Sequence, residues 1–210
     1  HAMASVGKLS GVQGLDIFCK ATKGMVDGEF MQLRNAARHN LSELEYHNAI
    51  IGKTGLLIAA ACEVGAVYGG ANADKCTGLR RYGINLGCGF QIIDDLLDYL
   101  GDPGKTGKAV GNDLAEGKIT LPLIFTINSA GEEHRSRLLQ IINSPELRLQ
   151  STEEVCSLIR KYGGFVAARK KAEEAVAAGI SGLAIFTGDN VQSERALLEG
   201  LARYVLTREK

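Results

Sequence analysis

The sequence predicts an all-α domain, and three observations support this fold class. Apolar residues recur at helical spacing along most of the chain, only 3 prolines interrupt it, and the period-two alternation that marks strands is nearly absent. With 210 residues, 45% of them hydrophobic, the chain is long enough to bury a substantial core. We find no internal boundary, so we expect residues 6–210 to form one domain and residues 1–5 to be an expression-vector remnant.

The helical pattern divides into successive segments. Ser42 and Glu45 form the pattern of a capping box at the start of one helix, and Ser151 and Glu154 repeat it later in the chain. Residues 54–69 are apolar nearly all round, which is typical of a helix buried inside a bundle. The other predicted helices cover about residues 12–38, 78–100, 122–129, 131–143, 165–186 and 190–207.

Composition and charge exclude several classes of protein. Equal numbers of basic and acidic residues, 24 of each, argue against general nucleic-acid binding, which usually needs a basic face. The 5 cysteines are widely spaced without a CxxC pair, as in a reduced cytosolic protein and not a disulfide framework or zinc site. The longest apolar run, residues 55–71, is short for a membrane span and contains Glu63. We therefore expect a cytoplasmic protein without a transmembrane segment.

An unusual polar pattern occupies the predicted helix over residues 78–100. Gln91, Asp94, Asp95 and Asp98 stand at positions i, i+3, i+4 and i+7, so they share one side of the helix; we call these four residues the acidic stripe. The neighbouring positions are apolar, which indicates a mostly buried helix whose acidic stripe faces a cavity. The alternative, a solvated acidic face, fits the apolar flanks poorly.

The acidic stripe predicts a magnesium site. Carboxylates this close repel one another, and burial makes their charged forms costlier, so a divalent cation would relieve the conflict. Mg²⁺ fits best because it takes oxygen ligands, keeps several waters and binds through one or two carboxylates plus phosphate oxygens. His39, His47 and His134 are scattered along the chain, so nothing favours a softer metal.

Lysines follow the acidic stripe in the glycine-rich residues 101–118. Lys105, Lys108 and Lys118 stand in this segment, whose glycines allow a loop to fold over a ligand. Lysines beside a magnesium–carboxylate cluster would meet phosphate oxygens, whereas each lysine taken alone could simply be solvated. The segment does not match a nucleotide-binding P-loop, and neither does the GKT at residues 52–54, so nucleotide hydrolysis is not expected.

The residues that carry these patterns resemble a known family. The runs GFQIIDDLLD (89–98) and GKAVGNDLAEGKITLP (107–122) are similar to the second aspartate-rich region of the trans-polyprenyl diphosphate synthases. MVDGEFMQL (25–33) resembles the helix before that family's Lys-Thr site, and IIGKTGLLIAAACEVGA (50–66) resembles the Lys-Thr helix itself. The Gly163-Gly164 break and the terminal YVLTR also fit the family.

The resemblance implies both a fold and a reaction. The fold is an orthogonal bundle of long helices around a deep central cavity (isoprenoid synthase-like), usually assembled as a homodimer. In the reaction, an allylic diphosphate ionises and isopentenyl diphosphate attacks the resulting carbocation. Such a site stabilises developing charge with preorganised groups and keeps water away from the cation.

The resemblance also assigns roles to the acidic stripe and to two of the lysines that follow it. It implies that Asp94, Asp95 and Asp98 help to hold Mg²⁺ against the allylic diphosphate, with Asp94 as the most direct ligand. It implies that Lys108 and Lys118 neutralise charge on the diphosphate. Lys105 has no counterpart in the family, and we expect it to be solvated.

Residues upstream complete the implied site. Lys53 would reach the same diphosphate, and the oxygens of Thr54 and Gln91 would stabilise the carbocation. Glu29 and Gln32 match polar positions of the family, although Gln32 is a weak candidate for direct contact. The simpler alternative for Lys53 and Thr54 is that they are ordinary polar residues at the start of a helix.

In one respect the sequence departs from the family pattern. It contains no second DDxxD motif and none of the upstream basic residues that bind isopentenyl diphosphate in the family. We therefore expect the C-terminal part of a longer synthase, with little or no elongation activity alone. A noncatalytic subunit of a heteromeric prenyl synthase, a terpene cyclase and a purely structural bundle remain as alternatives. The product chain length cannot be read from these residues.

Overall fold

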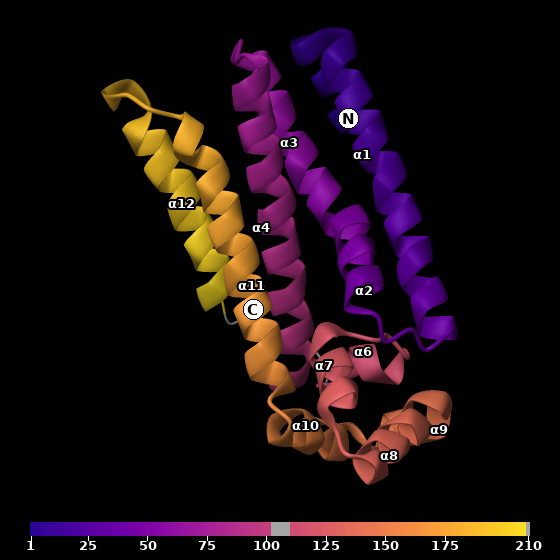
Figure 1. Cartoon of the computed structure of the whole chain (residues 1–210). Coiled ribbons are helices and arrows are strands. Elements are labelled where there is room, and N and C mark those ends of the chain that lie inside the picture. The colour runs from indigo at the N-terminus through magenta and orange to yellow at the C-terminus, as the bar shows by residue number, and fades with distance from the viewer. Residues whose placement is uncertain (102–109, 209–210) are drawn as a thin grey trace.

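The computed structural model describes residues 1–101 and 110–208, and all regular structure in these ranges is helical (Figure 1). The predicted all-α fold class is therefore confirmed. In chain order the α-helices are α1 (Ala2–Ala37), α2 (Glu43–Ile50), α3 (Leu56–Tyr68), α4 (Ala73–Leu100), α6 (Asn112–Ala115), α7 (Leu121–Ser129), α8 (Glu132–Asn143), α9 (Pro145–Gln150), α10 (Thr152–Lys161), α11 (Gly164–Ser181) and α12 (Gln192–Thr207). A π-helical turn, η1 (Ile51–Gly55), joins α2 to α3, and the 3₁₀ turns η2 (Gly182–Ile185) and η3 (Asp189–Val191) lie between α11 and α12.

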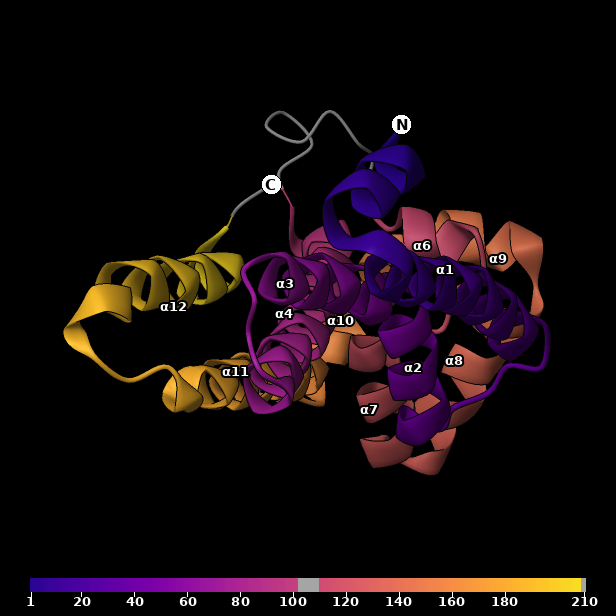
Figure 2. The same cartoon turned by 90° about the horizontal axis from the view of Figure 1, so that it is seen from above.

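The long helices pack side by side with α4 at their centre. Helix α1 contacts α3, α3 contacts α4, α4 contacts α11, and α11 contacts α12, so these helices follow one another across the molecule (Figures 1 and 2). The shorter helices α6 to α10 gather where α4 ends (Figure 1). The C-terminal turns of α4, which carry the acidic stripe, therefore lie at the junction between the long and the short helices.

The buried core is formed where α4, α7 and α11 meet. It includes many aliphatic and small side chains with almost no exposed surface, among them Ile92, Ile93, Leu96, Leu123, Ile124, Ile127, Ala168, Ala172 and Val176. Burying such side chains stabilises a fold by about 1.5–3 kcal/mol for each large aliphatic residue. The apolar flanks of the acidic stripe belong to this core, as the sequence pattern predicted, and they hold α4 in place.

Helix boundaries follow most of the predictions, with shifts at several ends; the largest is in α1, which begins at residue 2 and not at about 12 and has a kink at Gly11. Helix α1 ends at Ala37 and α10 stops before Gly163, which adopts the left-handed conformation with φ 74°. Helix α4 begins at residue 73 and not at 78, and the predicted helix over 165–186 divides into α11 and η2. The short helices α6 and α9 were not predicted, because a single helical turn leaves no periodic pattern in the sequence.

The structure contains the main hydrogen bond of the first predicted capping box, at Ser42. It does not contain that of the second, at Ser151. The Ser42 hydroxyl accepts a hydrogen bond from the Glu45 backbone N–H at 3.3 Å, as predicted. Ser151 does precede α10, but its side chain makes no capping hydrogen bond, so that prediction was wrong. Ser151 also ends α9 and has φ −109° and ψ 16°, so it lacks the extended backbone of a typical N-cap. Glu154 instead accepts hydrogen bonds from Arg137 on both carboxylate oxygens, each at 2.8 Å.

Helix α3 is not buried on all sides as its composition predicted. Its buried residues are Ala59, Ala60 and Ala66, whereas Leu57 is 40% exposed and Tyr68 is 65% exposed. The helix packs between α1 and α4 and leaves part of its remaining surface exposed. By length and composition alone, the run Glu43–Tyr68 could also cross a membrane, a criterion that core helices of soluble proteins meet as well. The prediction of no transmembrane segment therefore stays a prediction.

Glycines allow η1 to pack backbone to backbone against α1 and α4. A Cβ added at Gly52 would lie 2.8 Å from the Cα of Gly28, and one added at Gly87 would lie 2.6 Å from the Cα of Gly55. Carbon atoms prefer separations of about 3.5–4.0 Å, so a side chain at either position would force the helices apart. These contacts set how close η1 lies to α1 and α4, and therefore where its polar side chains lie between the two helices.

We predict that Gly87→Ala lowers the free energy of unfolding by about 1–3 kcal/mol, because the added methyl group collides with backbone that cannot move aside. Gly65→Ala is the matched control, since it also lies in a helix but has no neighbouring atom within 4 Å of the added Cβ. It should raise stability by about 0.5–1 kcal/mol. Urea denaturation measures both, and equal effects of the two substitutions would contradict the close packing.

Candidate functional site

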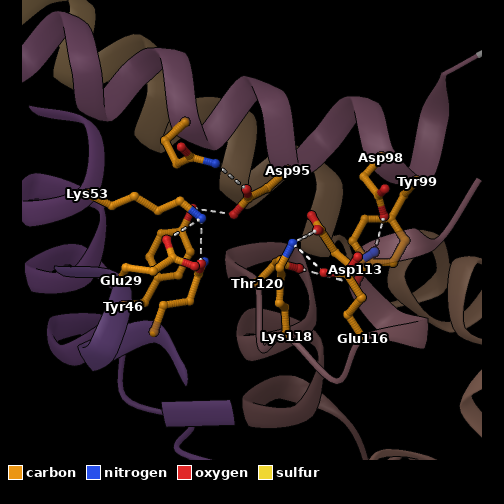
Figure 3. Close-up of polar contacts among 12 residues, drawn as sticks. Glu29, Tyr46, Lys53, Asp95, Asp98, Tyr99, Asp113, Glu116, Lys118 and Thr120 are labelled. Carbon is orange, nitrogen blue, oxygen red and sulfur yellow. Dashed lines mark hydrogen bonds and ion pairs between the residues drawn. The ribbon is translucent and has the colours of Figure 1, made fainter. Parts of the chain in front are cut away.

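The acidic stripe divides into an exposed part and a buried part. The Asp94 side chain is 55% exposed and Asp98 is partly buried, whereas Asp95 retains only 2% exposure. Asp95 points from α4 toward α2 and η1, as Figure 3 shows. The stripe therefore shares one side of the helix, as predicted, but of its three acids only Asp94 and Asp98 have surface open to a ligand from outside.

Asp95 and Gln91 are joined by hydrogen bonds to residues of two other elements. The Tyr46 hydroxyl of α2 donates to Asp95 Oδ2 at 2.7 Å, and Gln91 Nε2 donates to Asp95 Oδ1 at 3.0 Å. Thr54 of η1 donates its hydroxyl hydrogen to Gln91 Oε1 at 2.8 Å. The structure thus brings together Thr54, Gln91 and Asp95, as the sequence predicted, and adds Tyr46.

Burial changes the acidity of this group. Desolvation raises the pKa of Asp95 to about 7, and the negative charge of Asp113 acts in the same direction. The hydrogen bonds from Gln91 and Tyr46 oppose the rise because they stabilise the charged form. Desolvation also raises the pKa of Tyr46 well above its usual value, with Asp95 contributing, so the phenol stays protonated as a donor.

Lys53 is positioned by the π-helical turn and by two residues of α1. Its Nζ donates to Gln32 Oε1 at 2.7 Å and lies 3.0 Å from Glu29 Oε2 (Figure 3). The side chain is 28% exposed, so its charge is only partly screened by water. A π-turn adds a residue to one turn of the helix and so changes the direction of the side chains it carries, a feature frequent at functional sites.

Lys118 lies on the other side of Asp95 from Lys53 in Figure 3. Its Nζ lies 2.8 Å from Asp113 Oδ1 and 2.8 Å from Glu116 Oε2. Desolvation alone would lower the pKa of Lys118, but the hydrogen bonds to Asp113 and Glu116 raise it overall, so the amine stays charged. The segment is tied back to the acidic stripe, because the Asp113 backbone N–H donates to Asp98 Oδ2 at 3.0 Å.

Asp98 has an altered acidity of its own. Desolvation raises the pKa of Asp98 to about 6, and the nearby charge of Asp113 adds to the effect. The backbone hydrogen bond from Asp113 and the charge of Lys118 lower it again. Two acids of the stripe therefore hold their protons more tightly than an exposed aspartate would, as expected of a site built to receive positive charge.

Two of the predicted loop lysines cannot be placed. Lys108, predicted to bind diphosphate, and Lys105, expected to be solvated, lie outside the described residues. Their roles stay predictions.

A basic residue near the C-terminus reaches the exposed end of the stripe. The Arg208 guanidinium donates to the Phe90 carbonyl oxygen at 2.9 Å and to Asp94 Oδ1 at 3.4 Å. It also stacks over the Phe90 ring, with Cζ 3.7 Å from the ring centroid. This contact links residues more than 100 positions apart in the chain, so helical spacing could not predict it.

The donor set fits magnesium better than a metal that needs a closed protein cage. Within residues 1–101 and 110–208, no group of three or more Asp, Glu, His or Cys side chains converges on one point. Asp94 and Asp98 stand one turn apart on the accessible side of α4, while both oxygens of Asp95 already accept hydrogen bonds. One or two carboxylates completed by water and phosphate oxygens are the usual environment of Mg²⁺.

Sequence reasoning missed four residues of this site: Tyr46, Asp113, Glu116 and Arg208. Tyr46 lies seven positions before Lys53, two helical turns away, which is the one signal that it faces the same region. Asp113 and Glu116 belong to the DLAEGK run that carried the resemblance. Because these two acidic side chains stand close to Lys118 in the sequence, they could have been predicted to pair with it.

We predict that the metal-free protein loses stability as the pH rises from about 4 to about 7. Because the pKa of Asp95 is higher in the folded protein than in the unfolded chain, the folded state binds the proton more tightly. Its contribution is complete at low pH and disappears as the pH passes about 7. Asp95 alone accounts for a fall of at most about 1.4 kcal/mol for each pH unit, and Asp98, whose pKa is raised to about 6, adds to it at the lower end of the range.

Urea denaturation across this pH range checks the prediction with Asp95→Asn, which should flatten the slope. The exposed Asp27 provides the control, because Asp27→Asn should leave the slope as it is in the wild type. Parallel curves for the wild type and Asp95→Asn would show that this carboxyl does not carry the effect.

Comparison with known proteins agrees with the geometry. Residues 1–159 match the family model described as polyprenyl synthetase. Geranylgeranyl diphosphate synthase of Saccharolobus solfataricus is 30% identical over 222 residues, covering 100% of this chain and 65% of that protein. Octaprenyl diphosphate synthase of Escherichia coli (strain K12) is 32% identical over 208 residues, covering 99% of this chain and 62% of that protein. This chain thus spans less than two thirds of the length of either relative.

Solved structures show the same fold. Polyprenyl synthase from Caulobacter crescentus CB15, crystallised with calcium and isoprenyl diphosphate, superposes with a TM-score of 0.89 at 33% identity, covering 97% of this chain and 61% of that one. Decaprenyl diphosphate synthase from Rhodobacter capsulatus superposes with a TM-score of 0.83 at 34% identity, covering 94% and 60%. Since the family model matches most of the chain and the helical fold agrees, the protein belongs to the polyprenyl synthetase family.

Proposed function

We propose that the chain carries part of the active site of a trans-prenyltransferase. In this reaction an allylic diphosphate loses its diphosphate, isopentenyl diphosphate attacks the resulting carbocation, and a proton leaves to give a longer polyprenyl diphosphate. The observation that carries the proposal is the position of Lys53 and Lys118 on either side of Asp95, a member of the acidic stripe of α4 (Figure 3). Acids that can hold a divalent cation, flanked by two amines, match a magnesium diphosphate in charge.

The diphosphate end of the substrate is held by groups of opposite sign. Asp94 and Asp98 would hold Mg²⁺, which supplies charge neutralisation for the departing diphosphate when it is bound. The Lys53 and Lys118 amines would exchange their present carboxylate partners for phosphate oxygens. The complex of the Caulobacter crescentus polyprenyl synthase with calcium and isoprenyl diphosphate supports a divalent cation and a diphosphate as ligands, since that enzyme is a relative.

The carbocation end meets neutral dipoles. Thr54 and Gln91 meet where η1 packs on α4 and present oxygen atoms without a full charge. A carboxylate in the same place could trap the cation by forming a covalent bond, whereas a hydroxyl or amide oxygen stabilises it and lets it react onward. The apolar side chains that flank the acidic stripe limit the access of water, which would quench the cation.

Several further expectations gain no support beyond the family resemblance. The homodimer, the cytoplasmic location and the low activity of these 210 residues alone stay predictions. Direct coordination of magnesium by Asp95 also stays a prediction, and the two hydrogen bonds on its carboxylate give it a different role, argued below. A noncatalytic subunit and a terpene cyclase gain no separate support from any described contact.

We predict that the protein binds inorganic pyrophosphate in the presence of Mg²⁺ and loses this binding when EDTA removes the metal. Asp94→Ala should weaken the affinity about tenfold or more, because a ligand of the cation is lost. Isothermal titration calorimetry measures the dissociation constants directly. Binding that is equally tight with and without Mg²⁺ would overturn the proposed function.

Asp16→Ala serves as the control for Asp94→Ala. The Asp16 side chain is 56% exposed, close to the 55% of Asp94, and it likewise pairs with a basic residue, Lys20. Both substitutions therefore remove one exposed negative charge, but only one of them touches the site. An equal loss of affinity in the two variants would indicate a general charge effect and not a metal ligand.

A further inference from the structure

The hydrogen bonds that link Tyr46 to Thr54 all donate toward Asp95, Tyr46 directly and Thr54 through Gln91. They join three elements, with Tyr46 on α2, Asp95 and Gln91 on α4, and Thr54 on η1, and they measure 2.7, 3.0 and 2.8 Å. Building on the proposed prenyl transfer, we propose that Tyr46 and Asp95 are positioning residues. They orient the Gln91 amide so that the Thr54 oxygen turns its lone pairs, and not its hydrogen, toward the carbocation.

The direction follows from what each group is able to donate. Both oxygens of Asp95 accept hydrogen bonds, one from Tyr46 and one from Gln91, so Gln91 turns its NH₂ group toward the carboxylate. The amide oxygen of Gln91 then faces Thr54, and the only hydrogen of the Thr54 hydroxyl is used in that bond. The lone pairs of Thr54 are left for the substrate side, where negative potential stabilises a cation.

Tyr46 keeps the carboxylate in this accepting role. Asp95 is 2% exposed and Tyr46 is 5% exposed, so water cannot replace the phenol as a donor. Without a second donor one oxygen of the buried carboxylate would be left without a hydrogen bond, which is costly. An amide group at this position could donate to Gln91, rotate its amide and so reverse the hydrogen bonds from Gln91 to Thr54. Tyr46 acts through Asp95 and Gln91, without needing to touch the substrate.

The reversal makes Asp95→Asn an informative substitution. Asparagine has nearly the same shape, but its NH₂ group can donate to Gln91 Oε1, and the NH₂ of Gln91 would then face Thr54. Thr54 would accept that bond and point its hydrogen toward the cation. Tyr46→Phe tests the same set of hydrogen bonds at Asp95. It removes the hydroxyl that donates to Asp95 and keeps the aromatic ring.

The test compares two ligands within each variant, both with Mg²⁺ and at the same pH. One is an allylic diphosphate analogue with a protonated nitrogen in place of the carbon that becomes cationic, and the other is its neutral carbon isostere. The ratio of their dissociation constants by calorimetry reports the preference for positive charge and cancels any change in diphosphate binding. We expect the wild type to prefer the cation, and this preference to fall about tenfold in Tyr46→Phe and Asp95→Asn.

Tyr82→Phe is the matched control. Tyr82 is 1% exposed, and its hydroxyl donates to the Leu198 carbonyl oxygen at 2.7 Å, so the substitution also removes one hydroxyl hydrogen bond but far along α4 from the site. It should lower stability to a similar extent and leave the preference unchanged. A purely structural role of Tyr46 would make Tyr46→Phe behave like Tyr82→Phe, which would overturn the inference.

The remaining outcomes separate the two proposals. If the wild type shows no Mg²⁺-dependent pyrophosphate binding, the proposed function fails and this inference fails with it. If pyrophosphate binds but the wild type shows no preference for the cation, or both variants keep it, only the inference fails. If Tyr46→Phe does not fold, Asp95→Asn decides alone, because its shape leaves the packing unchanged.

Discussion

Backbone contact between η1 and its neighbours is the constraint on which the rest of the site depends. Gly28 and Gly52 join α1 to η1, and Gly55 and Gly87 join η1 to α4, with no side chain between the helices. At this spacing a polar side chain of η1 reaches its partners directly. Lys53 therefore meets α1, and the Thr54 hydroxyl meets Gln91 on α4. Glycine lowers the stability of a helix relative to alanine, but here it allows the backbones to approach this closely.

This proximity lets one helix carry acids with two different tasks. Asp94 and Asp98 keep the accessible side of α4, where a cation and a diphosphate can approach. Asp95 faces into the packing of α2 and η1, where desolvation raises its pKa to about 7 and hydrogen bonds hold it. Three aspartates that look alike in the sequence thus have two roles. Asp94 and Asp98 form a charged cluster at the surface, and Asp95 holds the buried hydrogen bonds in place.

Helical periodicity accounts for what the sequence could predict. The i, i+3, i+4, i+7 spacing placed the acidic stripe on one side of α4, and the lysines after it indicated a partner of opposite charge. Periodicity says nothing about tertiary contacts, so the burial of Asp95 by Tyr46 and the approach of Arg208 to Asp94 were missed. The π-turn was missed as well, since it reflects packing between glycines more than local propensity. The Ser151 capping box failed because Ser151 also ends α9 and its backbone is not extended as an N-cap requires.

The acidic stripe and the two amines beside it should form one pocket for a metal diphosphate, and every proposed role depends on this pocket. Its most direct test is the position of Mn²⁺, located by anomalous X-ray scattering in crystals grown with Mn²⁺ and inorganic pyrophosphate. We expect a peak beside the carboxylates of Asp94 and Asp98, with pyrophosphate between it and the amines of Lys53 and Lys118. A metal and pyrophosphate bound together on another face, with this pocket empty, would contradict the proposed site.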